Sequence, residues 1–595
     1  MKIRSDPNIH GISIVKNEIK LTAYADDASY FMRNIESAEL LLGLIEKFSK
    51  VSGLEVNRSK SECLLLDFEG TLSEYDDNFM GIPVVENLKI LGHFHGKNKI
   101  ICDFQNFYSK LEKIDKVMNI WNQRHLTLIG KNLLINALLN SLFIFNCQIE
   151  IPPPDFIKLV DEKNKTFLWG GTAKIAHHSI IADYSEGGIK YKDLACLITS
   201  VNVKFLFNRN NEDDKNSFVL PNLWIKQLFR INSTNENFQT KYFNKSMNIL
   251  DCKLKIPRKT LWQGHGFYYE VLKGFEKLLD SLPRSVEQLL SMPLWFNKFM
   301  DTSFDETISK AGYNYIKDLF PLGKLLEINT IETFNLNLLE KHKLITLVRN
   351  VPRQWSDYIH SQVAKDTVIY PFQSVNVNGQ DMPLKNLDSK VIYNILVRDK
   401  IRMPVGMINW CLDLELSDLQ IRTAFTFAHN CSSSTFDRMF QYKIATQILP
   451  TNDYLTRYRV KDTSVCQKCE LEFDSIEHSL YSCSEIVHII ATFIKFLTDE
   501  CGVTIDIGLI QYLFGISGSK YLGLNHVLLE LKKAIFYSWD SNIENNAFCQ
   551  QVKNNIKKII IKEKSIMLKN NQYEEFDTKW DKFVSIYDFR GPDLQ

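Results

Sequence analysis

The chain has 595 residues, of which 45% are hydrophobic and 24% are charged. These proportions are typical of a globular protein with a large core, and the length predicts about three to five domains. Lys and Arg number 71 against 70 Asp and Glu, so the chain as a whole has no charge that marks a nucleic-acid binder. Any basic surface must therefore be local.

Twelve cysteines lack the regular spacing of a disulfide framework, and residues 1–6 lack the apolar core of a secretion signal. We therefore expect an intracellular protein of the nucleus and cytoplasm. The longest uncharged run, residues 132–149, is too polar for a lipid-spanning helix because it is broken by Asn136, Asn140, Ser141, Asn146 and Gln148. We predict no membrane segment.

Residues 19–31 alternate apolar and polar side chains on both sides of Asp26 and Asp27, which predicts two short antiparallel strands joined by a tight turn. Asp is common in turns, so an ordinary surface turn is one interpretation. Two adjacent carboxylates, however, raise each other's pKa unless a cation holds both ionised. Because Mg²⁺ prefers carboxylate oxygen, the hairpin is a candidate metal platform.

Two further stretches follow the hairpin in order. Residues 48–62 contain Ser-Gly-Leu-Glu-Val-Asn and then Lys60, and residues 88–94 contain Leu91-Gly92. Together with Tyr24-Ala25-Asp26-Asp27, they resemble the last three palm motifs of reverse transcriptases from long-interspersed (LINE, non-LTR) retrotransposons. The resemblance implies an RNA-directed DNA polymerase, a nucleotidyltransferase that extends a primer 3′-hydroxyl by two-metal phosphoryl transfer.

The resemblance also implies roles for individual residues. Asp26 and Asp27 would bind the catalytic Mg²⁺ ions, and Lys60 would lie near the leaving pyrophosphate. Tyr24, Leu91 and Gly92 would help to bind the cofactor and the primer, the last two as the turn that grips the primer end. In this family another metal-binding Asp and the fingers precede the hairpin by many tens of residues, whereas twenty-three residues precede Tyr24 here. We therefore expect a C-terminal part of a polymerase that is inactive by itself.

The segment from Lys89 to Lys131 contains eight Lys or Arg and three acidic residues, a local net charge of +5. Aromatic residues lie among these charges, as a surface that stacks bases and follows phosphates requires. The alternative is a helix with a solvated basic face and a buried aromatic face. The six lysines and one Glu of residues 553–569 have the same two interpretations.

Helical spacing recurs along the chain. The apolar residues of 36–51 predict a helix that ends before Gly53 and packs on the sheet of the carboxylates. Leu134, Leu138, Leu142 and Phe145 form one apolar stripe, which we expect to face the core. The segments 121–131, 167–171 and 187–189 resemble the thumb of the same family, and residues 294–297 and 311–319 resemble its linker region.

Four candidate zinc ligands lie near the end of the chain: Cys466, Cys469, His478 and Cys483. Their spacing lets a short turn and one further element enclose one Zn²⁺, and in a reducing compartment clustered Cys favours metal over disulfide. Three reduced core cysteines and a surface histidine are the alternative. The cluster also resembles the zinc knuckle that follows the polymerase in these retrotransposons.

Together these features predict an α+β protein. We expect a partial palm (1–105), a helical thumb (106–208), a mainly helical linker region (209–437), a zinc-knuckle region (438–500) and a C-terminal helical region (501–595). The expected partners are an RNA template, a DNA primer or target, and other proteins that such an element encodes. The alternatives are a non-catalytic nucleic-acid-binding zinc protein derived from such an element and a zinc-containing scaffold unrelated to nucleic acid.

Overall fold

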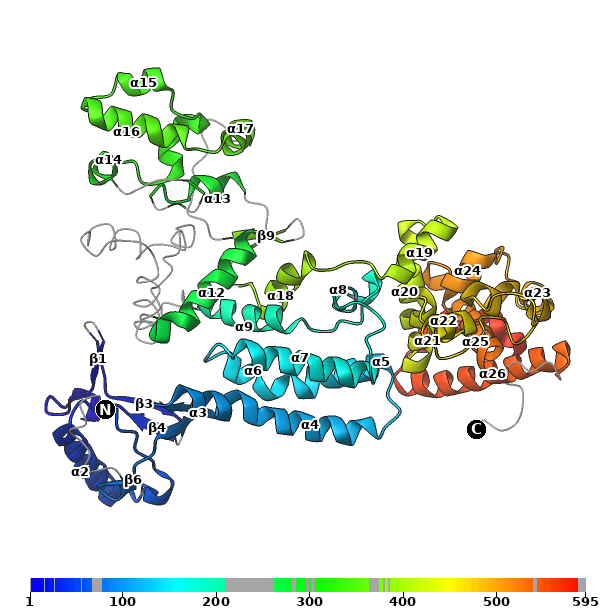
Figure 1. The fold of residues 1–595 in the computed structure, drawn as a ribbon, viewed down its shortest axis with the longest axis horizontal. Helices are drawn as coiled ribbons and strands as arrows, with labels where there is room; N and C mark the ends of the chain where they lie inside the picture. Colours follow the sequence, from blue (N-terminus) through cyan, green and yellow to red (C-terminus); the bar gives the residue numbers. More distant parts are fainter. Residues whose placement is uncertain are drawn as a thin grey trace. The chain divides into compact units, whose positions relative to one another are not determined.

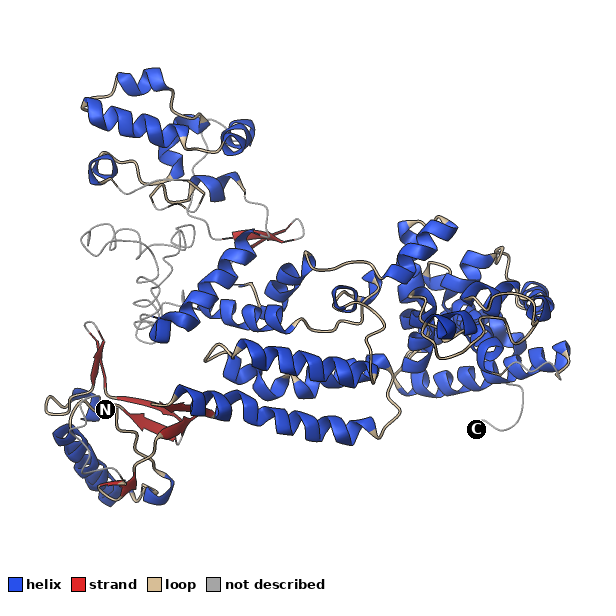
Figure 2. Cartoon of the chain, viewed as in Figure 1, coloured by secondary structure: helices blue, strands red, loops and turns tan. Residues whose placement is uncertain are grey.

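The computed structural model describes residues 2–14, 17–25, 27–54, 56–66, 77–208, 262–280, 285–295, 297, 299–300, 305–362, 374–377, 380–383, 386–538 and 543–586. Helices make up most of this part of the chain, and each of its sheets is a two-stranded antiparallel pair (Figure 2). The predicted α+β class is therefore confirmed.

The chain forms two compact units that alternate along the sequence, and their helices and strands are labelled in Figure 1. Unit 1 consists of residues 1–113, 142–158 and 194–399, and unit 2 of residues 114–141, 159–193 and 400–595. The predicted boundaries after Asn208 and Glu500 follow the ends of α9 (Leu194–Asn208) and α23 (Ser484–Asp499). The predicted boundary after Asp437 falls inside α21 (Thr435–Ala445).

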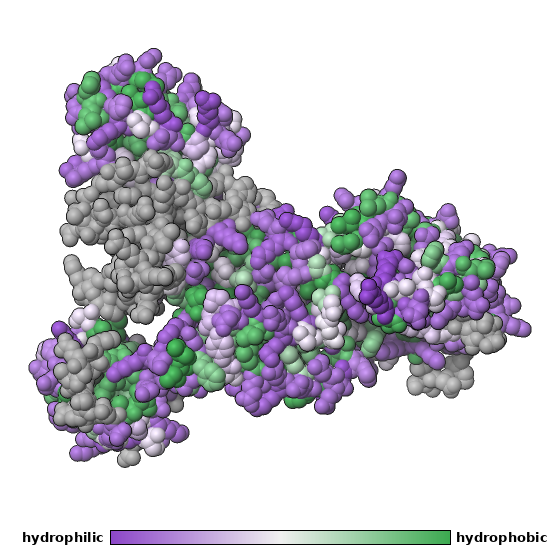
Figure 3. Space-filling model, in the orientation of Figure 1, coloured by the Kyte–Doolittle hydropathy of each residue, from purple (hydrophilic) through white to green (hydrophobic). Residues whose placement is uncertain are grey.

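The first part of unit 1 is built from small hairpins and one long helix. Its elements are α1 (Lys2–Ser5), β1 (Ile12–Ile14), β2 (Asn17–Ile19), β3 (Leu21–Tyr24), β4 (Asp27–Tyr30), α2 (Ile35–Ser52), the turn η1 (Arg58–Lys60), β5 (Asn78–Phe79), β6 (Ile82–Pro83), β7 (Asn87–Ile90) and β8 (His93–Gly96). Figure 3 shows apolar side chains at the surface of this part, and Phe48, Val51 and Leu54 are among the exposed ones.

Helix α2 begins and ends where its capping residues dictate. The Asn34 side chain accepts a hydrogen bond from the backbone N–H of Ser37 at the first turn. Gly53 closes the helix in the left-handed conformation, at φ +72°, and its N–H donates to the Ser49 carbonyl. The helix predicted from residues 36–51 is therefore confirmed.

The next elements of unit 1 support strand β8. They are α3 (Lys99–Asp103), the π-helical turn η3 (Phe104–Tyr108), the start of α4 (Ser109–Asn122), α6 (Ser141–Cys147) and the start of α7 (Pro154–Trp169). The buried Asn106 amide accepts from the Phe94 N–H at 2.8 Å and donates to the Phe94 carbonyl at 2.9 Å. Asn106 therefore takes the place that a neighbouring strand would have beside β8.

The remaining elements of unit 1 are helical apart from one hairpin. They are α9, α12 (Trp262–Asp280), α13 (Val286–Leu290), α14 (Glu306–Lys310), η9 (Ile316–Leu319), η10 (Pro321–Gly323), α15 (Ile328–Glu332), α16 (Leu338–Arg349), α17 (Arg353–Gln362), β9 (Ser374–Val377), β10 (Gln380–Pro383) and α18 (Ser389–Arg398). Helices α9, α12 and α18 pack against one another.

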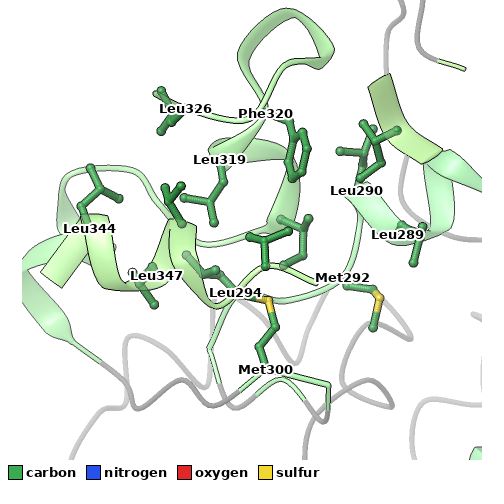
Figure 4. Close-up of a cluster of buried hydrophobic side chains, with 14 of the residues drawn as sticks. Leu289, Leu290, Met292, Leu294, Met300, Leu319, Phe320, Leu326, Leu344 and Leu347 are labelled. Carbon is green, nitrogen blue, oxygen red and sulfur yellow. The ribbon is translucent and has the colours of Figure 1, made fainter. Parts of the chain in front are cut away.

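Buried apolar residues from Leu289, Leu290 and Met292 through to Ile359 form a hydrophobic cluster of unit 1 (Figure 4). Trp295 is buried in it, and its indole N–H donates to the Tyr313 carbonyl at 3.0 Å. The backbone of Leu294 bonds to Asn314, and that of Ile316 bonds to Met292. The two segments that resemble the linker region therefore pair with each other inside one core.

Unit 2 is helical, and α25 lies at its centre. Its elements are the rest of α4, α5 (Leu128–Leu134), η4 (Ile135–Leu139), the rest of α7, α8 (His177–Ile180), η5 (Tyr184–Glu186), α19 (Val405–Leu414), α20 (Asp418–Cys431), α21, α22 (Asn452–Arg457), η12 (His478–Ser482), α23, α24 (Leu509–Phe514), η13 (Ser519–Tyr521), α25 (Leu522–Tyr537), α26 (Asn545–Lys569), α27 (Tyr573–Trp580) and η14 (Asp581–Ile586). Nearly every residue of α25 from Gly523 to Ile535 is buried.

The apolar stripe predicted at Leu134, Leu138, Leu142 and Phe145 does not face the core. Leu138 and Phe145 are 40% and 47% exposed, and the buried side chains lie one or two residues further on, at Ile135, Leu139, Phe143 and Cys147. Residues 128–147 are apolar on almost every face, so the spacing alone fits more than one phase. The π-helical turn η4 interrupts the α-helical repeat and allows the other phase.

None of the described helices is long and apolar enough to cross a membrane on its own. One bent pair, Leu128–Leu139 with Ser141–Cys147, has sufficient length and apolar composition when both helices are taken together.

Candidate metal centre

Cys466 and Cys469 lie on a tight turn of unit 2. The backbone of Val465 pairs with that of Phe473, and the Cys466 N–H donates to the Glu472 carbonyl at 2.8 Å. Glu470 takes the left-handed conformation at φ +57°, and its N–H donates back to the Cys466 carbonyl. This turn directs both thiols to the same side of the chain.

The other two candidate ligands frame a π-helical turn. His478 opens η12, and Cys483 follows it at the N-terminus of α23. The Cys483 N–H donates to the His478 carbonyl at 3.0 Å. The four ligands predicted from the sequence therefore lie on a turn and a helix start that meet.

The ligand atoms form one compact group. All four lie within 4.8 Å of one another, with Cys466 Sγ 4.0 Å from Cys483 Sγ and Cys469 Sγ 3.3 Å from His478 Nε2. Bonds of about 2.3 Å to sulfur and 2.0 Å to nitrogen in a tetrahedron place sulfurs about 3.8 Å apart and sulfur and nitrogen about 3.5 Å apart. The observed distances match both values closely, so the group can hold a metal ion such as zinc.

The pKa values of the three thiols differ, so the thiols lose their protons to form the metal-binding thiolate with unequal ease. Burial raises the pKa of Cys483 to about 12 and also raises the pKa of Cys466. Burial acts in the same direction on Cys469, but the N–H groups of Leu471 and Glu472 lower its pKa to about 7. A dication among the sulfurs would displace the remaining thiol protons.

Two charged residues flank the centre. Oε2 of Glu472 lies 3.0 Å from Nδ1 of His478, which forms no aligned hydrogen bond with the described residues. A carboxylate in this position orients a metal-binding imidazole and increases its basicity. The Lys468 ammonium donates to the Ser479 carbonyl at 2.7 Å, so its side chain ties the turn to η12.

The chain around the centre has more acidic than basic residues. From Thr451 to Cys483 the chain has four basic and six acidic residues. Leu471 and Phe473 are exposed at its surface. A site with four protein ligands leaves no position open for water, so the chemistry that it supports is structural rather than catalytic.

The predicted hairpin is present as β3 and β4. Tyr24 pairs with Asp27 across the turn, and Ala25 takes the positive φ of +53° that a two-residue turn requires. Tyr24 is 71% exposed and Asp27 is exposed. Asp26 lies outside the described residues. In the described part of the chain, the Cys-His group is the only set of three or more ligands gathered at one point.

The other residues assigned by resemblance also lie in unit 1. Leu91 and Gly92, at φ +47° and +89°, form the two-residue turn between β7 and β8. A Cβ on Gly92 would lie 3.7 Å from the Phe145 ring, so the turn lies beside α6. Lys60 is exposed at the end of η1, and its backbone N–H donates to the Asn57 side chain. Its side chain forms no hydrogen bond or ion pair with the described part of the hairpin.

Unit 1 also contains a buried polar group that no motif in the sequence predicts. His93 is buried beside His95 and Glu150, and Nε2 of His93 lies 3.7 Å from the Glu150 carboxylate. Burial, with the charges of His95 and Lys99, lowers the pKa of His93 to about 4. His93 is therefore neutral at pH 7. Sequence reasoning missed this group because its members come from β8, α3 and the segment before α7.

A comparison with models of known protein families finds no match for this chain.

Proposed function

We propose that this chain is a zinc-containing, nucleic-acid-binding protein related to the reverse transcriptases of non-LTR retrotransposons. The observation that carries the proposal is a group of three lysines on one surface of unit 1, Lys89 on β7 and Lys110 and Lys113 on α4. Burial and the nearby charges of Lys113 and Lys89 lower the pKa of Lys110. No carboxylate of the described residues pairs with any of the three.

The Lys110 ammonium, on which the charges of Lys113 and Lys89 act, is stabilised when an anion joins it. Phosphates of a nucleic acid are such anions, and releasing their counterions supplies much of the binding free energy. Phe104 is 60% exposed in the neighbouring turn η3, and Lys89 lies 5.5 Å from the Phe94 ring centroid. Aromatic rings beside lysines can stack unpaired bases, so single strands are the favoured ligand.

In this proposal the Cys-His group is a structural metal site that stabilises the local fold. Zn²⁺ is the metal that a closed Cys₃His set prefers in proteins. Cys466, Cys469, His478 and Cys483 would hold it and fix α23 to the turn before it. The acidic surroundings of the centre support phosphate binding by the lysine group and not by the knuckle.

We assign no catalytic step to the hairpin in this chain. Its two strands pair only with each other among the described residues, and Asp27 has no described carboxylate beside it that would complete a two-metal site. Phosphoryl transfer depends on positioned metals for nearly all of its rate. The chain by itself is therefore proposed to bind nucleic acid without extending a primer.

The binding proposal is tested by charge reversal. Lys110→Glu with Lys113→Glu removes two phosphate contacts, so the plot of log affinity against log salt for a single-stranded RNA of about 20 nucleotides should lose about 1.4 from its slope. The matched control reverses Lys310 and Lys324, which gives the same change in net charge. Equal slopes for wild type and the first variant would refute the lysine group as the binding surface.

The catalytic part is tested separately by primer extension. With Mg²⁺, template RNA and an annealed primer, the chain should yield no elongated product above a no-protein control. Joining it to an upstream segment with the acidic motif and fingers of the family should restore extension. Template-directed synthesis by the 595-residue chain alone would show that other residues complete the metal site.

A further inference from the structure

An exposed apolar surface lies on the turn of the metal centre. Leu471 and Phe473 are 81% and 72% exposed, and Val465 is 37% exposed. Val465 and Phe473 form an antiparallel bridge, so their side chains lie on the same side of the turn. Single exposed apolar residues are common on proteins, whereas several gathered on one turn mark an interaction surface. We call these three residues the knuckle face.

The rim of the knuckle face is acidic. Glu470 and Glu472 alternate with its apolar residues, and Asp462 precedes Val465 by three residues. Glu470 and Asp462 are exposed, and the Glu472 side chain is 71% exposed. No Lys or Arg of the described residues forms an ion pair with these three carboxylates. A partner for the knuckle face should therefore offer apolar surface together with positive charge.

Helix α26 of unit 2 presents a surface of that kind (Figure 1). Lys558, Lys562 and Lys569 are exposed and recur at helical spacing, so they form a stripe within about 40° around the helix axis. Ile561 and Ile566 flank the stripe and are 44% and 45% exposed. In the described part of the chain, no carboxylate pairs with any of the three lysines. We call these five residues the α26 face.

The acidic residue of α26 does not neutralise the stripe. Glu563 is the only acidic residue of this helix. Its carboxylate accepts from the Lys579 ammonium at 2.6 Å and from the Trp580 indole N–H at 2.9 Å. Because Trp580 is buried, Glu563 is directed to the inside of unit 2. The α26 face therefore keeps its positive charge.

The composition of the α26 face suits a protein partner better than a nucleic acid. Phe548 is the only aromatic residue of α26 and is buried, so the helix offers no exposed ring that could stack on a base. The isoleucines beside the lysines suit a partner with apolar side chains. The knuckle face has such side chains and the opposite charge, and every copy of the chain carries both faces.

We propose that the knuckle face of one copy binds the α26 face of a second copy. The apolar residues of the two faces would be buried against each other, and the carboxylates of the rim would pair with the lysine stripe. Both faces are exposed within one copy, so they do not contact each other there. The inference goes beyond the proposed function and does not depend on RNA binding.

The two faces differ, so the contact between copies is heterologous. Each copy in a dimer still offers one free face, and self-association therefore continues beyond the dimer into an open chain or a closed ring. The faces are small, so we expect association at concentrations of about 10–100 µM.

Sedimentation equilibrium of the full chain tests the proposal, after nuclease treatment so that RNA does not link the copies. The apparent mass should exceed that of one copy as the concentration rises from about 1 to about 100 µM. It should fall when salt is added, because salt screens the attraction between the rim and the stripe.

Two double variants remove one face each. Leu471→Ser with Phe473→Ser removes the apolar part of the knuckle face, and Lys558→Glu with Lys562→Glu reverses the stripe. Each should weaken self-association by at least about tenfold. Lys310→Glu with Lys324→Glu, in unit 1, gives the same change in net charge as the second variant and should associate as wild type does.

Mixing the two double variants tests which faces meet. The first variant keeps an intact α26 face, and the second keeps an intact knuckle face. An equimolar mixture should therefore form a dimer and nothing larger, although each variant alone is monomeric. A contact between two identical faces would not give this result, because one of the variants would then associate by itself.

The fold of the first variant is checked by its zinc content, which should equal that of wild type because both replaced side chains are exposed. Glu470→Lys keeps both apolar side chains and is a second variant of the same face, which should also weaken self-association. If the first variant loses zinc, Glu470→Lys and the variant of the stripe decide.

Four results would overturn the inference. They are a wild-type chain that stays monomeric over the whole range, wild-type self-association in a variant of either face, a monomeric mixture of the two double variants, and a variant of the stripe that lowers the salt slope for RNA but associates normally. The last result would assign the stripe to nucleic acid. RNA binding by the lysine group of unit 1 is measured separately, so the proposed function stands or falls by itself.

Discussion

The buried ammonium of Lys532 should make the stability of unit 2 depend on pH, and Lys532→Met should remove that dependence. Lys532 on α25 is fully buried, and its Nζ donates to Gln441 Oε1 at 2.9 Å and to the Leu513 carbonyl at 2.8 Å. Nζ also lies 5.0 Å from the Phe427 ring centroid. Neither hydrogen-bond acceptor is charged, so no anion compensates for the loss of water around the ammonium.

The magnitude follows from the pKa. Burial lowers the pKa of Lys532 to about 7 from the usual 10.5. Below pH 7 both the folded and the unfolded chain hold the proton, and above pH 10.5 neither does. Between these values the unfolded chain binds the extra proton, so the free energy of unfolding rises with pH by about 1.4 kcal/mol per unit. The gain from pH 7 to pH 9.5 is about 3 kcal/mol.

Differential scanning calorimetry of the full chain from pH 6 to pH 9.5 checks this. The stability of wild type relative to Lys532→Met should be constant below pH 7 and should rise above it. Lys533→Met is the matched control. Burial alone would lower the pKa of Lys533, but Glu530 and Asp437 raise it above its usual value, so its effect should be flat over this range. A difference between wild type and Lys532→Met that does not change with pH would refute the reasoning.

Three further results are expected. Purified chain should contain about one zinc, which Cys469→Ser should release and Cys411→Ser, at a cysteine outside the centre, should retain; elemental analysis decides, and full zinc in Cys469→Ser would contradict the site. Asn106→Leu should destabilise β8 by about 2–4 kcal/mol, because two partly buried backbone groups of Phe94 lose their partner; hydrogen exchange of residues 93–96 measures the loss, and wild-type protection would contradict it. Gly188→Ala should lower the melting temperature of unit 2, because its Cβ would lie 2.0 Å from the Ala182 carbonyl oxygen; an unchanged melting temperature would show that the backbone moves aside freely.

The sequence by itself determined the features that depend on neighbouring residues. The cap at Gly53 follows from the backbone freedom of glycine, and the hairpin of β3 and β4 follows from the alternation of apolar and polar residues on both sides of its turn. The positive φ of Ala25 and Leu91 does not follow from a local preference, because residues other than Gly, Asn and Asp rarely adopt it. The four ligands of the metal centre could also be predicted, because Cys483 follows Cys466 by only seventeen positions and a short segment has few ways to fold around one ion.

Only the tertiary structure decided which side chains are buried and what they meet. In residues 128–147 the apolar residues fit more than one helical phase, and packing against α7 and the backbone of Ile189 selected the phase that also buries Asn132 and Asn140. Lys532 and Lys533 are adjacent lysines on α25. The Lys532 ammonium donates to a backbone carbonyl and a side-chain amide oxygen, whereas the Lys533 ammonium pairs with two carboxylates. Glu530 lies three residues from Lys533 on the same helix, but Gln441, Leu513 and Asp437 come from other helices, and a local pattern contains no information about them.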